Sequence, residues 1–504
     1  LRAIDHSGLS KTDQLNARLF ERDLEIEIEA GGFGQRSILF TTYSGWHSEL
    51  AGLSDSLPFF NKADYVSYLQ RLKDIPRYNA EGIATTKWGI EHGYVQPCAP
   101  LENFSKTITA YIVDDVNDNV FMKPFADRPS TINEADWAEL KAQAKASVTS
   151  DVIPAFKAWA EYYETDYAPN CRAEVGASSM PEGAEYYAHR IRAETTTDMT
   201  AEQIHRIGLS EVARIRAEME EVIKRAEFDG DFKAYQDYLR TNPAFYAKTA
   251  DALLERSAYI AKKIDGELPK LFTRLPAMPY TVKPVPAEIA EGTTTAYYEP
   301  PAGDGSRAGV YRVNTSKLDQ RPLFEMEALT LHEAVPGHHF QIALQQELDL
   351  PNFRRFGGIT AFVEGWALYA ERLGLEVGFY QTPETDFGRL SYEMWRACRL
   401  VVDTGMHAKG WTKQQAIDFM AENTALSMHN IEAEVNRYIT WPGQALGYKM
   451  GELKIRELRE RAERALGENF DLRKFHDAVL ENGAIPLSVL EDIINTWIEE
   501  QRMS

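Results

Sequence analysis

Three histidines and a glutamate lie close together in the run His332-Glu333-Ala-Val-Pro-Gly-His338-His339. Two histidines four positions apart on a helix, with a glutamate directly after the first, can bind zinc and place a general base beside it. In this chain the fourth position after His332 is Pro336, and the next histidines come six and seven positions on. The chemistry therefore depends on whether the backbone brings His338 or His339 back beside His332.

A regular helix would not bring these side chains together. Each residue advances about 100° and about 1.5 Å, so His339 would face the same way as His332 but roughly 10 Å further along the axis. His338 would point about 120° away from His332. Pro336, however, has no N–H to donate to the His332 carbonyl, and Gly337 can adopt unusual backbone angles. We therefore expect a local bulge that absorbs two residues and moves His338 into the place of the second histidine.

Two glutamates on a downstream helix complete the pattern. Glu364 and Glu371 lie seven positions apart on one face of the amphipathic stretch 360–371. The interval after His338 lets this helix run back beside the first, so Glu364 is the predicted third metal ligand. Glu371 is a candidate to orient a ligating imidazole, or an alternative ligand. The competing interpretation is a core helix with an unrelated His-Glu pair and a solvated acidic face.

Two histidines, one glutamate and an open position are typical of a catalytic zinc site. In such a site Glu333 would act as general base and take a proton from the water that zinc activates. The sequence therefore predicts one zinc ion bound by His332, His338 and Glu364, with His339 as the alternative ligand.

The surrounding chain is predicted to be mainly helical. Periodic apolar positions and capping residues predict helices over 10–30, 62–75, 133–164, 201–227, 251–268, 323–347, 360–373, 386–409, 413–423, 427–440, 444–466 and from 487 onward. Pro76 is expected to end the second of these helices, and Pro154 to kink or divide the third.

Three strand-like runs, 280–283, 294–298 and 310–314, lie directly upstream of the histidines. Asp304-Gly305 between the last two is a hairpin signal. We expect one large domain over 1–504, mainly α, with a small antiparallel sheet next to the metal-binding helix. Two sub-lobes, 1–275 and 276–504, are the alternative.

The composition restricts the class of protein. A chain of 504 residues with 44% hydrophobic content is typical of a well-cored globular protein. The 55 basic and 76 acidic residues give a net charge of −21, which argues against a nucleic-acid-binding protein. The acidity is interpreted as an aid to solubility, with attraction of cationic substrates as the alternative. No apolar run of about 18 residues predicts a transmembrane segment.

The first residue is Leu1, so we expect a trimmed or processed chain whose signal or lipid anchor is missing. Three cysteines are present, without a Cys-x-x-Cys pair, which excludes a cysteine-only metal site. Cys98 and Cys171 lie in proline-containing turns and are candidates for a disulfide in an oxidising compartment, with two reduced thiols as the alternative. Cys398, inside a predicted helix, is expected to be a buried free thiol.

Several motifs can be compared with known families: the histidine run itself, Glu364-Gly-Trp-Ala-Leu-Tyr-Ala-Glu371, Asp403-Thr-Gly-Met-His407, and Pro442-Gly-Gln-Ala-Leu-Gly-Tyr448-Lys-Met-Gly451. With these motifs the chain resembles the bacterial domain-of-unknown-function family 885 over nearly its whole length. Many members look like secreted or lipid-anchored proteins, which implies a periplasmic or cell-envelope location.

That family is distantly similar to the helical zinc peptidases of the neurolysin, angiotensin-converting-enzyme and thermostable-carboxypeptidase type. The similarity implies a two-lobed helical body with a deep channel and a short peptide as substrate. It also makes His407 and Tyr448 candidates to hold the tetrahedral oxyanion. The insertion at Pro336-Gly337 departs from the peptidase motif and leaves the choice between His338 and His339 open.

Two further residues are candidates for substrate binding. Arg437 could clamp a substrate carboxylate, and Asn314 could lie on a sheet edge that receives the substrate as an added strand. The alternatives are a structural ion pair for Arg437 and, for Tyr448, a buried aromatic side chain.

The predicted function is a zinc-dependent hydrolase, most specifically a peptidase that cleaves short peptides with Glu333 as general base. The alternative is a non-catalytic peptide-binding envelope protein that retains the cleft. A carboxylate-rich iron protein would need Glu-x-x-His pairs on two helices, and the sequence offers none that is convincing.

Overall fold

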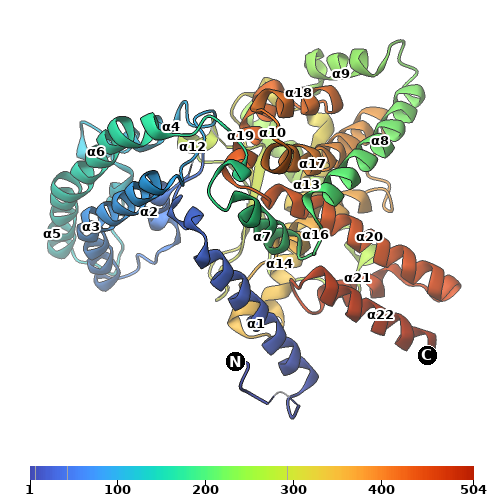
Figure 1. Ribbon diagram of the computed structural model, residues 1–504. Coiled ribbons are helices and arrows are strands. Elements are labelled where there is room, and N and C mark those ends of the chain that lie inside the picture. The colour runs from blue at the N-terminus through green and yellow to red at the C-terminus, as the bar shows by residue number, and fades with distance from the viewer. Residues whose placement is uncertain (6, 43, 292, 504) are drawn as a thin grey trace. The chain divides into compact units, whose positions relative to one another are not determined.

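The computed structural model describes residues 1–5, 7–42, 44–291 and 293–503. It is mainly helical, as the sequence predicts (Figure 1). The chain folds into two compact units, each described separately below. The larger unit comprises Leu1–Ile28, Tyr187–Tyr438 and Pro442–Ser504, and the smaller one Glu29–Tyr186 and Ile439–Trp441. None of the boundaries between these two units falls near residue 275, where the alternative prediction divides the chain.

The smaller unit is built around an aromatic core. Its helices are α2 (Trp46–Ser56), α3 (Lys62–His92), α4 (Phe104–Thr109), α5 (Glu134–Ser147) and α6 (Ile153–Tyr162). In the core, Phe40 stacks on Phe104 with ring centroids 4.5 Å apart, and Trp46 lies 4.2 Å from Trp159. Each such pair contributes about 0.5–1.5 kcal/mol beyond its buried area.

Pro76 and Pro154, the two prolines expected to interrupt helices of this unit, behave differently. Pro154 follows a widened helical turn over 148–152 and lies at the start of α6, so the predicted division is confirmed. Pro76 lies inside α3, and the expected helix end there is wrong. Tyr68, Leu72 and Ile75 on this helix are buried, and this burial stabilises the helix across the missing hydrogen bond.

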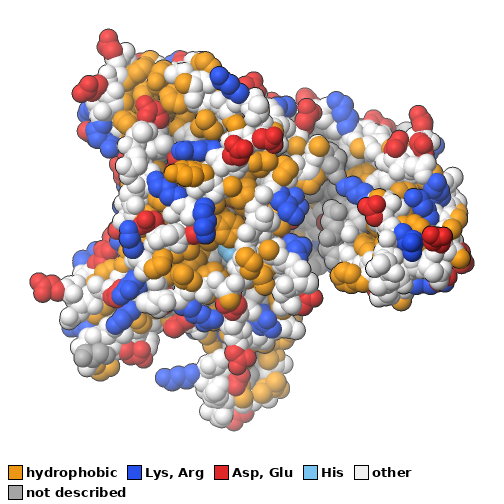
Figure 2. Space-filling model, turned by 180° about the vertical axis from the view of Figure 1, so that it is seen from behind, with side chains coloured by type: hydrophobic (Ala, Val, Ile, Leu, Met, Phe, Trp, Pro, Cys, Tyr) orange, Lys and Arg blue, Asp and Glu red, His pale blue; other side chains and the backbone are white. Residues whose placement is uncertain are grey.

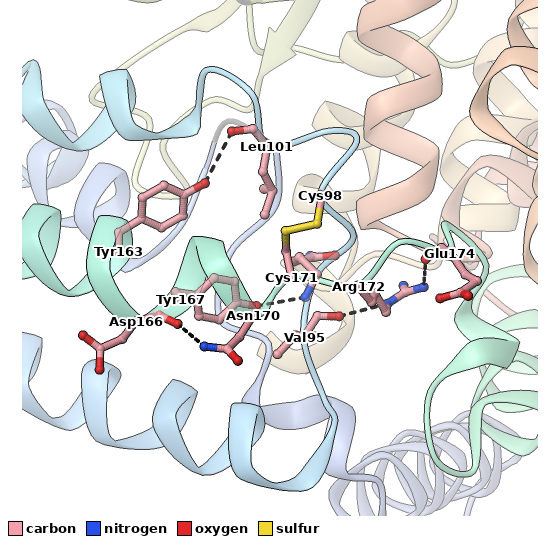
Figure 3. The surroundings of a disulfide bond; sticks show 11 residues. Val95, Cys98, Leu101, Tyr163, Asp166, Tyr167, Asn170, Cys171, Arg172 and Glu174 are labelled. Carbon is pink, nitrogen blue, oxygen red and sulfur yellow. Dashed lines mark hydrogen bonds between the residues drawn. A yellow bond between two sulfur atoms is a disulfide. The ribbon is translucent and has the colours of Figure 1, made fainter.

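The predicted Cys98–Cys171 disulfide is confirmed (Figure 3). The two chain segments that carry these cysteines are also joined by a backbone hydrogen bond, in which Cys98 N–H donates to Arg172 O at 2.9 Å. Cys398 is a buried free thiol, as expected.

The larger unit holds the rest of the helices. They are α1 (Lys11–Gly32), α7 (Gly183–Thr195), α8 (Ala201–Arg225), α9 (Phe232–Thr241), α10 (Ala250–Asp265), α11 (Leu268–Leu271), α12 (Ala287–Ala290), α13 (Met326–Glu333), α14 (His338–Glu347), α15 (Asn352–Arg355), α16 (Thr360–Leu373), α17 (Pro383–Lys409), α18 (Lys413–Asn423), α19 (Met428–Thr440), α20 (Gly447–Leu466), α21 (Leu472–Leu480) and α22 (Leu487–Met503). Helices α1, α7 and α19 each include residues of both units.

Two helix pairs form the frame of the larger unit: α8 packs along α17, and α16 along α20 (Figure 1). The second pair is unusually close. A Cβ at Gly451 of α20 would lie 1.8 Å from the Ala361 carbonyl oxygen of α16, so only glycine fits there. This close packing brings the Glu364 region of α16 beside the Tyr448 region of α20.

The small sheet has the strand order β1-β3-β2, formed by β1 (Tyr280–Pro284), β2 (Ala296–Glu299) and β3 (Gly309–Val313). β2 and β3 are antiparallel and joined by the predicted hairpin at Asp304-Gly305, where Gly305 has φ +79°. β1 pairs with β3 in parallel, so the prediction of a purely antiparallel sheet is wrong. The longer connection through α12 allows β1 to reach the far side of β3 and run in the same direction.

None of the described helices is both long and apolar enough to cross a membrane. On the face shown in Figure 2, acidic and basic side chains are interspersed with hydrophobic ones. The negative net charge is therefore not gathered into one acidic patch on that face.

Candidate metal centre

The chain breaks its helix within the histidine run. α13 ends at Glu333 and α14 begins at His338, with four residues between them. Ala334 N–H still donates to Thr330 O at 2.9 Å, and His339 N–H then donates to Ala334 O at 3.0 Å. The sequence predicts a bulge in a continuous helix, whereas the structure shows two helices joined by a tight turn.

Gly337 makes this turn sterically feasible. A Cβ there would lie 1.9 Å from the His332 carbonyl oxygen, so no other residue could approach α13 this closely. The turn is also fixed from outside, because Trp366 Nε1–H of α16 donates to Pro336 O at 2.8 Å. Together these contacts hold the start of α14 against α13 and α16.

The break brings three side chains to one point. Glu364 Oε2 lies 3.5 Å from His332 Nε2 and 3.4 Å from His338 Nε2. The three atoms all lie within 4.8 Å of one another. The two imidazole rings are nearly perpendicular, at 86°, with centroids 4.7 Å apart.

This donor set fits a zinc ion. Ligand atoms about 2.1 Å from one tetrahedral zinc would lie about 3.4 Å from each other, close to the separations from Glu364 to the two imidazoles. Glu364 Oε2, which faces both imidazoles, is also buried without a hydrogen-bond partner. Facing atoms that do not hydrogen-bond to each other are expected where lone pairs converge on a shared cation.

The histidines and glutamates of the cluster shift each other's pKa values. Burial alone would lower the pKa of His332, but the adjacent carboxylates of Glu364 and Glu371 raise it to about 9. Burial alone would raise the pKa of Glu364, but His338 and His332 hold it well below its usual range. Burial raises the pKa of Glu333, partly offset by the two histidines.

A second carboxylate fixes the tautomer of His332. Glu371 Oε1 lies 2.8 Å from His332 Nδ1, so Nδ1–H donates to this carboxylate and Nε2, which faces Glu364, is the ring nitrogen that could bind a metal. Arg396 Nη2 lies 3.2 Å from the same Glu371 oxygen and balances its charge. That Glu371 orients a metal-binding imidazole stays a prediction.

His339 faces a different element. Its Nδ1 lies 2.8 Å from Tyr298 OH on β2, and its Nε2 lies 2.9 Å from Met278 O. Burial lowers the pKa of His339 to about 4. Of the two neighbouring histidines, the structure turns His338 toward His332 and Glu364.

Tyr448 and Arg437 lie next to the cluster. The Tyr448 ring is nearly parallel to the His332 ring, at 13°, with centroids 6.4 Å apart. Arg437 Nη2 donates to Tyr448 OH at 3.3 Å and to Gln444 Oε1 at 2.7 Å. Arg437 Nη1 also pairs with Glu434 at 3.3 Å.

The other two predicted site residues have structural contacts. His407 is fully buried, with Nε2 3.0 Å from Tyr438 O and its ring 5.2 Å from that of Tyr187. Asn314 is fully buried too, and its amide donates to the carbonyls of Ala290, Thr293 and Thr294.

Asn314 also departs from the expected edge position. It follows β3, the central strand, and its own N–H donates to Thr295 O at 3.0 Å. The edges of the sheet are β1 and β2 instead.

Three residues near the cluster escape the sequence reasoning: Arg396, Arg399 and Tyr298. Arg396 and Arg399 are buried on α17, where Arg399 pairs with Glu434 and lies 4.3 Å from the Tyr448 ring. The available signal is their position in an otherwise apolar helical stretch, where a charged side chain usually has a buried partner. No local pattern singles out Tyr298.

The comparisons with known proteins now define the class of this chain. Residues 1–494 match the family described as "Bacterial protein of unknown function (DUF885)", so the chain belongs to this family, as its motifs indicate. No match was found among curated proteins.

Several solved structures are similar to this one, and two of them are described. The first, "the putative lipoprotein from Colwellia psychrerythraea", superimposes with a TM-score of 0.87 at 33% identity, covering 92% of this chain and 81% of the other. The second, "a putative lipoprotein of unknown function from Shewanella oneidensis", gives a TM-score of 0.71 at 19% identity, with coverages of 98% and 89%. The second likeness concerns the fold alone.

Proposed function

We propose that this protein is a zinc-dependent hydrolase that cleaves short peptides. The observation that carries the proposal is the convergence of His332 Nε2, His338 Nε2 and Glu364 Oε2, with Glu333 directly beside the first ligand. Two histidines and one carboxylate leave a coordination position open for water or substrate, as catalytic zinc sites do.

Zinc bound there would supply a Lewis acid and lower the pKa of a water molecule. Glu333 would accept the proton of the attacking water, a role that typically accelerates a reaction about 10²- to 10⁴-fold. Tyr448 oxygen accepts a hydrogen bond from Arg437, which leaves the phenol O–H to donate to the negative oxygen of the transition state.

The sheet supports a peptide as the substrate. Among the described strands, β2 pairs on one side only, with β3, and it packs against α13. An extended peptide could add to its outer edge through backbone hydrogen bonds. This edge takes the place that the sequence assigns to Asn314. Arg437, beside Tyr448, is the candidate to bind a substrate carboxylate.

We also infer a cell-envelope location, either secreted or lipid-anchored. The similar structure from Colwellia psychrerythraea is described as that of a putative lipoprotein. The Cys98–Cys171 disulfide agrees with this, because disulfides persist in oxidising compartments such as the periplasm.

The proposal is tested with purified protein, by metal analysis and by hydrolysis of a broad peptide library. We expect near-stoichiometric zinc and cleavage that is lost on chelation. Glu333→Gln should retain zinc and lose cleavage. Protein that binds peptides and cuts none of them would instead be the non-catalytic binding protein, and cleavage unchanged in Glu333→Gln would reject the mechanism.

A further inference from the structure

The imidazole of His339 is held at both nitrogens. A carbonyl oxygen can only accept, so Nε2–H donates to Met278 O at 2.9 Å. Nδ1 then carries the lone pair and accepts the Tyr298 O–H at 2.8 Å. The side chain is almost fully buried, with 1% of its surface exposed. His339 is therefore a neutral side chain in one fixed tautomer.

The two partners of His339 lie at opposite edges of the sheet. Tyr298 belongs to edge strand β2, and Met278 lies two residues before the start of edge strand β1. The ring crosses the central strand at Gly309, where a Cβ would lie 2.8 Å from His339 Nδ1 and 2.3 Å from Tyr298 OH. The absence of a side chain at Gly309 gives the imidazole and the phenol the room they occupy.

The side-chain bonds of His339 add to the contacts that already hold the start of α14 against α13 and α16. The break before α14 separates its orientation from that of α13, and its N-cap residue, Gly337, has no side chain to cap the first turn. His339 lies in that first turn, one position after His338. The Tyr298 ring also lies near the His338 ring, with centroids 6.5 Å apart and planes 24° from parallel.

We propose that His339 is a positioning residue, not a metal ligand: by binding Tyr298 and Met278 it fixes the rotation of α14 that aims His338 at Glu364. The inference rests on the metal site proposed above and assigns a role to the second histidine of the pair. Loss of both hydrogen bonds would let α14 rotate, so His338 would meet the other two ligands less often.

The test is zinc affinity, measured by competition with a chromophoric chelator, in five variants. His339→Leu should bind zinc about 10- to 100-fold more weakly, the usual cost of losing a residue that orients a ligand. His339→Gln keeps one acceptor and one donor and should recover most of the affinity. Tyr298→Phe, which removes only one bond, should fall between these two.

Tyr280→Phe is the matched control. The Tyr280 ring lies 4.7 Å from the His339 ring, but its hydroxyl bonds Asp265 and Ala261 O instead of the imidazole. Its zinc affinity should equal that of the wild type. The visible spectrum of the Co²⁺-substituted protein, a second readout, should keep its band positions in His339→Gln.

The outcomes separate the two proposals. Loss of zinc in His339→Leu as complete as in His338→Ala, with an altered cobalt spectrum in His339→Gln, would make His339 a ligand and overturn the inference. Wild-type affinity in His339→Leu would also overturn it while leaving the metal site intact. Absence of zinc binding in the wild type would reject the metal site and this inference together.

Discussion

His338 Nε2 lies 3.4 Å from Glu364 Oε2, and the next residue, His339, is directed at the sheet. Neighbouring residues of a helix point about 100° apart, so only one of the two can face α16. The break between Glu333 and His338 decides which one does. The expanded motif therefore turns His338 toward Glu364 and His339 toward the sheet.

Glu371→Gln should weaken zinc binding without removing a ligand. The glutamine carbonyl oxygen can still accept from His332 Nδ1–H. It lacks, however, the negative charge that makes the imidazole more basic and therefore a stronger metal ligand. We expect affinity to fall about 10- to 100-fold, measured by chelator competition.

Glu376→Gln is the control for this prediction, because Glu376 is an exposed carboxylate paired with Arg459. If both glutamine variants bind zinc equally well, Glu371 has no role in orienting His332.

Tyr448→Phe should lower kcat and leave KM nearly unchanged. The phenol O–H is proposed to bind the oxygen that becomes negative in the transition state, and removal of one such donor typically costs about 10²- to 10³-fold in kcat. Steady-state kinetics on a cleaved peptide measures the effect, and zinc content should not change.

Tyr438→Phe serves as the comparison for Tyr448. Its hydroxyl accepts from Trp395 and Arg399 in the core, so its loss should reduce stability and leave kcat close to that of the wild type. A rise in KM at constant kcat in Tyr448→Phe would contradict the oxyanion role.

Arg437→Gln should reduce the preference for peptides with a free C-terminal carboxylate. A hydrogen bond to a charged group contributes about 1.5–3 kcal/mol, which corresponds to about 10- to 100-fold in kcat/KM. The experiment compares each peptide with its C-terminally amidated form. The amidated form is the internal control, because damage to the Glu434 and Tyr448 contacts of Arg437 would slow both forms equally.

Much of the fold could be predicted from periodicity and capping. The capping box at Thr200, for example, starts α8 as expected. Pro76 and Pro336 show where prediction from local sequence rules fails. Pro76 and Pro336 have the same local effect on a helix, yet α3 continues through the first and α13 ends before the second. The outcome depends on tertiary packing, here the buried face of α3 and the close approach of Gly337 to α13.

The candidate site shows the same division between local and distant information. His332, His338, Glu364 and Glu371 could be found because their residue types stand in two short motifs, one on each of two successive helices, and Pro336-Gly337 indicates a break between the histidines. Arg396 and Tyr298 could not, since they reach the site from α17 and β2 through packing that no local pattern encodes. The parallel pairing of β1 with β3 escaped for the same reason.

Asp403 should make the protein less stable as pH rises. Burial raises its pKa to about 7, opposed by hydrogen bonds from Tyr187 O–H and Gly443 N–H; nearby Glu194 raises it further and Arg190 lowers it. Its unfolded pKa is about 3.9. Between the two values the folded state keeps a proton that the unfolded state has lost. The free energy of unfolding should therefore fall as pH rises, by at most about 1.4 kcal/mol per pH unit.

Asp403→Asn removes this proton and keeps a carbonyl oxygen for Tyr187 and Gly443. Its free energy of unfolding, measured in denaturant from pH 4 to 8, should fall less steeply with pH than that of the wild type. Asp418→Asn changes an exposed carboxylate that accepts from Gln414, and it should keep the wild-type slope. Equal slopes in all three proteins would show that Asp403 is ionised in the folded state throughout this range, with its buried charge stabilised by the two donors.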